Sequence, residues 1–167
     1  PCCVATQQMS IPSRATLIIT PPAIISQWER EIQRHTISKN GKPLEVLVYN
    51  GVESICKSSE KKKRDRGSLM RLVHPRILAD VDIVLMTFDA LMSDLGHSDD
   101  NRFITGTPGD GTGSNLRKRK RYRVVPSPLT SIRWWRVCLD EAQRVETPTA
   151  GSARMALKLE ADHRWAV

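Results

Sequence analysis

Short apolar runs, separated by polar or turn-forming stretches, make up the hydrophobic pattern of this chain. We interpret four of them as buried strands of a parallel sheet: 15–20, 44–49, 82–87 and the run that ends at Leu139. The apolar end of the chain, 164–167, predicts a further strand. Trp134 and Trp135 cannot face the same side of a strand, so we expect one to pack in the core and the other to cover an edge or a partner surface.

Helical periodicity appears between these strands. Ile25, Trp28 and Ile32 recur on one helical face, which predicts a helix over about 23–34 with Pro22 near its first turn. We expect Trp28 and Ile32 to be core residues. Three more helices are predicted: a short one within 69–78 that is interrupted before Pro75, one over 88–95, and one from an N-cap at Thr147-Pro148 to about 161.

Alternation of strands and helices predicts an α/β fold, a mostly parallel sheet with helices on both faces. A chain of 167 residues is long enough for one such domain. No apolar run approaches the about 20 residues that span a bilayer, which argues against a membrane protein. The first residue is Pro1, so we expect a segment cut from a longer protein, truncated at both ends.

The net charge of +8 is concentrated in two segments. Residues 57–66 carry a net charge of +4 and residues 117–123 (R-K-R-K-R-Y-R) carry +6, which leaves about −2 for the remainder. Both segments belong to expected flexible inserts, at about 52–67 and 96–121. Such clusters suit a polyanion or a nuclear-import receptor, although solvated loops without a ligand explain them as well.

The candidate chemistry lies where the last long apolar run ends. Asp140 and Glu141 follow Leu139 directly, and the carboxyl end of a strand is where an open α/β sheet binds ligands. An aspartate there can hold Mg²⁺ through water, while a glutamate can polarise a water for attack on a γ-phosphate of ATP. This is the Walker B arrangement, written D-E-A-Q. Two solvated acids at a strand end are the alternative.

Cysteines and histidines add no second site by spacing alone. The four cysteines predict no disulfide framework, and Cys138 inside the last long strand behaves as a small apolar residue. The four histidines show no metal-ligand spacing with one another or with the cysteines.

Four segments of the chain resemble known sequence motifs and follow one another in the same order as those motifs. Residues 15–31 (A-T-L-I-I-T-P-P-A-I-I-S-Q-W-E-R-E) resemble motif Ia, 82–91 (D-I-V-L-M-T-F-D-A-L) motif Ib, and 139–143 (L-D-E-A-Q) motif II. Residues 163–167 (H-R-W-A-V) resemble the lead-in to motif III. The chain is similar, over about 14–167, to the first RecA-like lobe of the Swi/Snf family of superfamily-two helicase-like translocases, with 1–13 as the tail of a preceding segment.

The resemblance implies an ATP-dependent DNA translocase or chromatin remodeller that uses ATP and Mg²⁺ and binds duplex DNA or nucleosomes. Asp140 and Glu141 would be catalytic, and Gln143, where most relatives have histidine, would couple the nucleotide site to DNA. The DNA-backbone track would include Thr20, Pro21 and Thr87, although strand-end capping explains both threonines as well. The basic run would add Arg117, Lys118, Arg119, Lys120, Arg121 and Arg123.

The D-E-A-Q sequence and the paired tryptophans are similar to the histone-linker, PHD and RING helicase subgroup. In that subgroup a zinc finger precedes motif Ia, so Cys2 and Cys3 are candidate Zn²⁺ ligands. The subgroup implies a nuclear protein that is also a RING-type ubiquitin ligase, with a ubiquitin-conjugating enzyme as partner of regions outside this chain.

One expected motif is missing from the sequence. No G-x-x-x-x-G-K-[ST] loop occurs, and Gly41-Lys42 is followed by Pro43 without a glycine-rich loop before it. The segment by itself is therefore expected not to hydrolyse ATP. A catalytically degenerate lobe that binds nucleic acid or protein remains the alternative function.

Overall fold

A six-stranded parallel sheet forms the centre of the computed structural model, which describes residues 10–36, 41–61, 74–98 and 125–167. The strands run in the spatial order β6, β5, β2, β4, β3, and β1 lies in line with β2 along the same edge of β5. Their bounds are β1 Ile11–Pro12, β2 Thr16–Thr20, β3 Val46–Val48, β4 Ile83–Thr87, β5 Ile132–Leu139 and β6 Glu160–Ala166. The predicted parallel sheet is confirmed.

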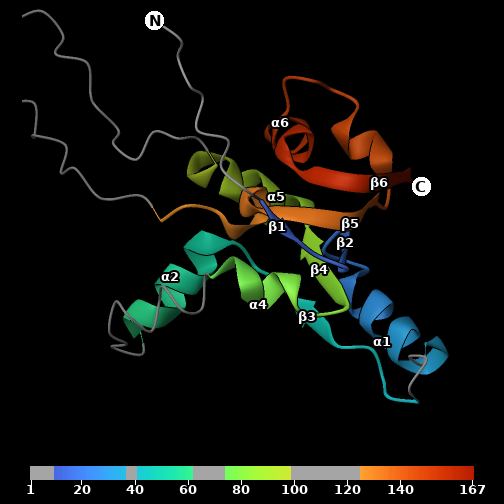
Figure 1. Ribbon diagram of the computed structural model, residues 1–167. Helices are drawn as coiled ribbons and strands as arrows, with labels where there is room; N and C mark the ends of the chain where they lie inside the picture. The colour runs from blue at the N-terminus through green and yellow to red at the C-terminus, as the bar shows by residue number, and fades with distance from the viewer. Residues whose placement is uncertain (1–9, 37–40, 62–73, 99–124) are drawn as a thin grey trace, which may run out of the picture.

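Helices cover both faces of the sheet (Figure 1). Helix α1 packs on one face, with Ile32 among Ile18, Leu85 and Cys138. Helices α4, α5 and α6 contribute to the larger core cluster on the other face. The helices are α1 Ile25–His35, α2 Val52–Lys61, α4 Pro75–Ala79, α5 Phe88–Asp94 and α6 Gly151–Lys158, with short 3-10 turns η1 Leu95–His97, η2 Pro128–Ser131 and η3 Ala142–Val145. Within the described residues, no helix has the length and apolar character that a membrane crossing requires.

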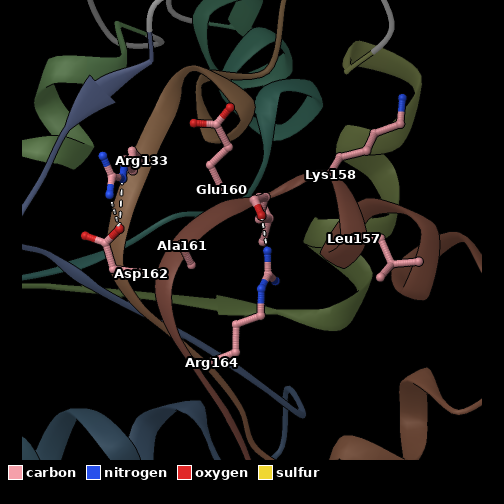
Figure 2. Close-up of a pocket in the computed structure, with 8 residues that line it drawn as sticks. Arg133, Leu157, Lys158, Glu160, Ala161, Asp162 and Arg164 are labelled. Carbon is pink, nitrogen blue, oxygen red and sulfur yellow. Dashed lines mark hydrogen bonds and ion pairs between the residues drawn. The ribbon is translucent and has the colours of Figure 1, made fainter.

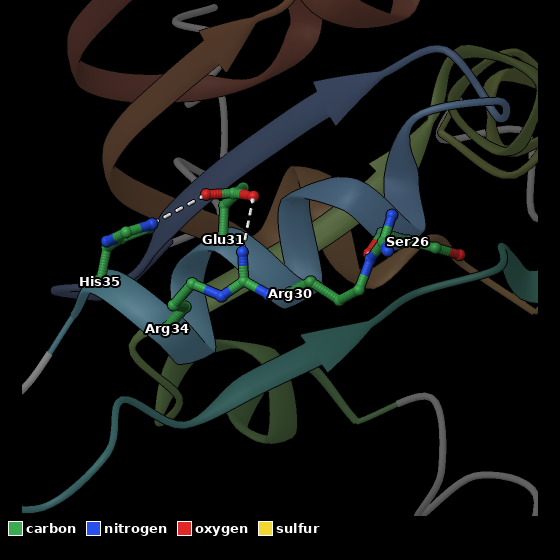
Figure 3. A network of polar contacts seen from close by, with 5 residues as sticks. All are labelled: Ser26, Arg30, Glu31, Arg34 and His35. Atoms are coloured by element: carbon green, nitrogen blue, oxygen red, sulfur yellow. Dashed lines mark hydrogen bonds and ion pairs between the residues drawn. The ribbon is translucent and has the colours of Figure 1, made fainter.

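Helix α1 forms where the apolar spacing predicts it, and its two sides differ in chemistry. Its inner side carries Ile32 and the half-buried Trp28 into the core. On its outer side, Glu31 pairs with His35 at 3.0 Å and with Arg34 at 3.9 Å (Figure 3). These exposed pairs support the helix weakly, so burial of the inner side determines where α1 lies.

Helix α2 occupies a stretch whose charge predicts a flexible insert. The prediction is wrong for 52–61, because the first turn of α2 is anchored in the core. Gly51 adopts a φ of 84°, Val52 is fully buried, and Ile55 packs against the main cluster. Glu53 and Lys57, one turn apart, pair at 2.6 Å. The rest of that expected insert, 62–67, lies outside the described residues.

Two further differences concern the ends of elements. Ile11–Pro12, expected to belong to a separate tail, pair with β5 as strand β1, and two residues are too few to show a period. Helix α6 begins at Gly151 with Ala150 as N-cap, because Thr147 only closes a preceding turn through its carbonyl. A Cβ at Gly151 would lie 2.8 Å from Met92 Cγ, so glycine permits α6 to approach α5 closely.

The paired tryptophans of β5 divide as predicted. Trp134 is fully buried and donates its indole N–H to the carbonyl of Leu129 at 3.2 Å. Trp135 is 44% exposed and meets the ring of His163 edge-on, with 4.4 Å between centroids. One tryptophan therefore belongs to the core, and the other covers the outer surface of β5 and β6.

Candidate functional site

The carboxyl ends of three neighbouring strands bring the predicted site residues to one edge of the sheet. Thr20 ends β2, Thr87 ends β4 directly beside it, and Asp140 follows β5. The amide of Asp140 donates to the carbonyl of Ile19 at 2.9 Å, which continues the β5–β2 pairing one residue beyond the strand. The chain thus holds Asp140 beside Thr20.

Asp140 is half-buried, and one of its two carboxylate oxygens is fully engaged. Oδ2 accepts the hydroxyl of Thr20 at 3.0 Å and the indole N–H of Trp28 at 2.7 Å. No hydrogen bond to Oδ1 comes from the described part of the chain. The carboxylate is therefore held by one oxygen and has the other available for a ligand.

Glu141 has a backbone conformation that L-residues rarely adopt. With φ 61° and ψ 54° it is left-handed, unlike every other non-glycine residue in the described ranges. Its neighbours impose the turn, since Ala142 N–H donates to the carbonyl of Val167 at 3.0 Å and Val167 N–H to that of Leu139 at 2.9 Å. Such strain costs roughly 1–3 kcal/mol and collects at functional sites.

Gln143 lies on turn η3 and donates its side-chain amide to Oε2 of Glu141, and both side chains are exposed. The next residue, Arg144, stacks over the ring of Phe88 at 5.9 Å. Phe88 begins α5, directly after Thr87. Turn η3 therefore contacts, through Arg144, the segment predicted to be motif Ib.

Both threonines of the predicted DNA track make contacts within the protein. Thr20 is fully buried and its hydroxyl bonds to Asp140, whereas Thr87 caps α5 by accepting the amide of Ala90 at 3.1 Å. Pro21 is half-buried and begins the turn into α1. The alternative of capping is observed for Thr87. Thr20 has no exposed surface, so the expected contact of Thr20 with DNA is not supported, and contact of Pro21 and Thr87 with DNA stays a prediction.

Two groups of predicted site residues, Cys2 with Cys3 and the basic run 117–123, lie outside the described residues. Within the described ranges, no three His, Cys, Asp or Glu residues cluster as metal ligands. Cys138 is buried below the site, and burial, followed by the nearby charge of Asp140, raises the pKa of its thiol. It behaves as the apolar core residue that the sequence predicts.

The chemistry of Asp140 fits Mg²⁺. This ion prefers oxygen ligands and keeps several waters, so one or two carboxylates at a strand end suffice to hold it beside a phosphate. Oδ1 accepts no hydrogen bond from the described residues, and the bonds to Oδ2 orient the half-buried Asp140, so Oδ1 provides such an oxygen.

Comparison with known proteins decides the family. The profile of the SNF2-related domain matches residues 2–167. The chain belongs to the SNF2-related domain family. The E3 ubiquitin-protein ligase SHPRH of Homo sapiens is 42% identical over 166 residues, or 99% of this chain and 8% of that protein. The helicase-like transcription factor of Oryctolagus cuniculus is 33% identical over 152 residues, or 91% of this chain and 11% of that protein.

A solved SWI2/SNF2 ATPase core of Sulfolobus solfataricus in complex with dsDNA covers 96% of this chain, and the chain covers 21% of it, at 18% identity and a TM-score of 0.47. That likeness is too distant to carry weight by itself. The chain spans about a tenth or less of the length of the two curated relatives, SHPRH and the helicase-like transcription factor.

A separate hollow lies at the opposite edge of this SNF2-related domain (Figure 2). Arg133 pairs there with Asp162 at 2.6 Å, and Arg164 donates to the carbonyl of Leu159. These groups satisfy one another at the amino-terminal ends of β5 and β6. Because ligands of open α/β sheets bind at the carboxyl ends, this hollow is not the candidate site.

Sequence reasoning missed the bond from Trp28 to Asp140. Trp28 lies in the first turn of α1, eight residues after the strand end at Thr20, and its apolar spacing predicts only a core residue. The indole N–H of Trp28 could have indicated such a bond, because a tryptophan N–H that is removed from water needs an acceptor. Here the acceptor is Oδ2 of Asp140.

Proposed function

We propose that this SNF2-related domain is a segment of an ATP-dependent DNA translocase or chromatin remodeller, in which ATP hydrolysis is coupled to DNA binding. The observation that carries the proposal is the paired acids at the end of β5. Asp140 is oriented by two donors, and Glu141 is held in a left-handed turn beside it. Two merely solvated acids would need neither arrangement.

Asp140 would hold Mg²⁺ through water, and the ion would neutralise charge on the β- and γ-phosphates of ATP. Glu141 is exposed and adjacent, so its carboxylate can accept a proton from the attacking water and orient it. Gln143 hydrogen-bonds Glu141 and lies beside the start of α5 through Arg144. The bond to Glu141 and the neighbouring contact of Arg144 with Phe88 support a coupling role for Gln143.

Duplex DNA or nucleosomes would contact Pro21 and Thr87 at the carboxyl edge and the basic run 117–123, whereas the fully buried Thr20 would act only through its bond to Asp140. The names of the relatives extend the proposal to the full protein. It would be a ubiquitin ligase, as one relative is named. By the subgroup resemblance it would also be nuclear and work with a ubiquitin-conjugating enzyme, and Cys2 and Cys3 would complete a zinc finger with ligands outside this chain.

Replacement of Glu141 by glutamine in the full-length protein tests the hydrolytic role. We expect Glu141→Gln to bind ATP with unchanged affinity and to lose turnover by at least about 100-fold, the low end of a general-base contribution. Glu146→Gln, the same change at an exposed residue of the same turn, is the matched control and should keep turnover.

Substantial hydrolysis by Glu141→Gln would remove Glu141 from that role. A wild-type protein that binds DNA but neither binds nor hydrolyses ATP would support the alternative, a degenerate lobe that acts as a binding module.

A further inference from the structure

The hydrogen bond between Trp28 and Asp140 joins two elements that are far apart in the sequence. The indole Nε1 of Trp28, on α1, lies 2.7 Å from Oδ2 of Asp140, beyond the end of β5. This distance is at the short end of the range for N–H···O bonds, as is typical when the acceptor carries a charge. The bond is partly buried, so water competes for it poorly.

Packing holds the indole in place. Trp28 is half-buried against the cluster of Ile18, Leu85 and Cys138, on the face of the sheet that α1 covers. Ile32, one turn further along α1, is buried in the same cluster. The donor therefore belongs to a rigid core element, whereas the acceptor belongs to a turn at the edge of the sheet.

Both donors bind the same carboxylate oxygen. Thr20 and Trp28 reach Oδ2 from β2 and from α1, which fixes the plane of the carboxylate and leaves Oδ1 available. Removal of groups that orient a metal ligand in this way commonly changes metal affinity by roughly 10- to 100-fold.

We propose that Trp28 is a positioning residue for the metal-binding carboxylate. It holds Asp140 by Oδ2, so that Oδ1 would be available to hold Mg²⁺, and it links this carboxylate to helix α1. The inference rests on the proposed function, because it assigns Trp28 a role only if Asp140 holds the ion. Its consequence is that any displacement of α1, which follows the predicted DNA contact at Pro21, moves a metal ligand.

The test compares two tryptophan-to-phenylalanine variants of the full-length protein. Trp28→Phe keeps an aromatic ring in the core but removes the N–H, and Trp134→Phe makes the same change in the same sheet. Trp134 bonds the carbonyl of Leu129 and lies in the other core cluster, so it controls for loss of a buried indole. The readout is the Mg²⁺ concentration that half-saturates binding of a fluorescent ATP analogue at equilibrium.

We expect Trp28→Phe to raise that concentration by about tenfold or more, and Trp134→Phe to change it less than about twofold. Equal effects of the two variants would overturn the proposal, because a merely structural indole would then explain both. If Trp28→Phe fails to fold, benzothienylalanine at position 28 replaces the N–H by sulfur in a ring of nearly the same shape. The same rise is expected, and no rise overturns the proposal.

Asp140→Asn separates this inference from the function on which it rests. A large loss of Mg²⁺-dependent ATP binding in Asp140→Asn, together with no effect of Trp28→Phe, would refute only the positioning role. Unchanged Mg²⁺ dependence in Asp140→Asn would refute the metal role of Asp140, and the role of Trp28 with it.

Discussion

Removal of the Tyr49 hydroxyl should increase local opening of the segments that Asp94 holds together. Asp94, at the end of α5, is fully buried and accepts the hydroxyl of Tyr49 at 2.8 Å, the amide of Val52 at 2.9 Å and the hydroxyl of Ser127 at 2.6 Å. These three donors belong to the segment after β3, to the start of α2 and to the segment before η2. Tyr49→Phe keeps the buried ring and removes one of them.

The structure sets the size of the effect. In the described part of the chain Asp94 accepts hydrogen bonds and forms no ion pair, so those hydrogen bonds set the size of the effect. A hydrogen bond to a charged group contributes about 1.5–3 kcal/mol. Since about 1.4 kcal/mol is a factor of ten in an equilibrium constant, local opening should become roughly 10- to 100-fold more frequent.

Hydrogen exchange in the full-length protein measures this opening directly. Peptides that contain Val52 and Ser127 should exchange about 10- to 100-fold faster in Tyr49→Phe, whereas peptides from β2 should change little. Tyr122→Phe, the same change in the basic run 117–123, is the matched control. Exchange of the Val52 peptide within about twofold of wild type would show that the Tyr49 hydroxyl does not help to hold Asp94 in place.

Three further outcomes follow from single features. Gln143→Ala should bind ATP normally but lose most of the stimulation of hydrolysis by duplex DNA; unchanged stimulation would contradict the coupling role. Neutralising the six basic residues of 117–123 should make the slope of log K for duplex binding against log salt concentration shallower, by about 0.9 for each phosphate that is no longer neutralised. Unchanged duplex affinity would show that this segment is a solvated loop without a ligand. Burial, and then the charge of Asp94, raises the pKa of Tyr49. The stability that the neutral phenol contributes is therefore present below about pH 10 and falls above it. In thermal unfolding, the melting temperature of Tyr49→Phe should fall less at alkaline pH than that of the wild type.

The strands, and the position of the two acids at the end of β5, could be predicted from the sequence because they depend on local patterns. A continuous apolar run bounded by turn residues identifies a buried parallel strand, and β2, β4 and β5 lie within two residues of the ends predicted for them. The acids at the end of β5 follow from the same pattern. Family membership then follows from the order of such segments.

What the sequence could not predict depends on contacts between distant residues. Helix α2 forms because Val52 and Ile55 reach the core, which outweighs the charge that made 52–67 look flexible. The donors to Asp140 and Asp94 come from segments between 33 and 120 residues away. The hydrophobic periodicity of the sequence does not predict hydrogen bonds between such distant residues. For Trp28 it therefore predicted only a core position.

Hydrolysis of ATP by the full-length wild-type protein, measured with Mg²⁺ in the presence and absence of duplex DNA, is the decisive test of the proposed function. We predict turnover that requires Mg²⁺, rises with DNA and disappears in Glu141→Gln. Absence of hydrolysis with both Mg²⁺ and DNA present would refute the proposed function, and the acids at the end of β5 would then have no catalytic role.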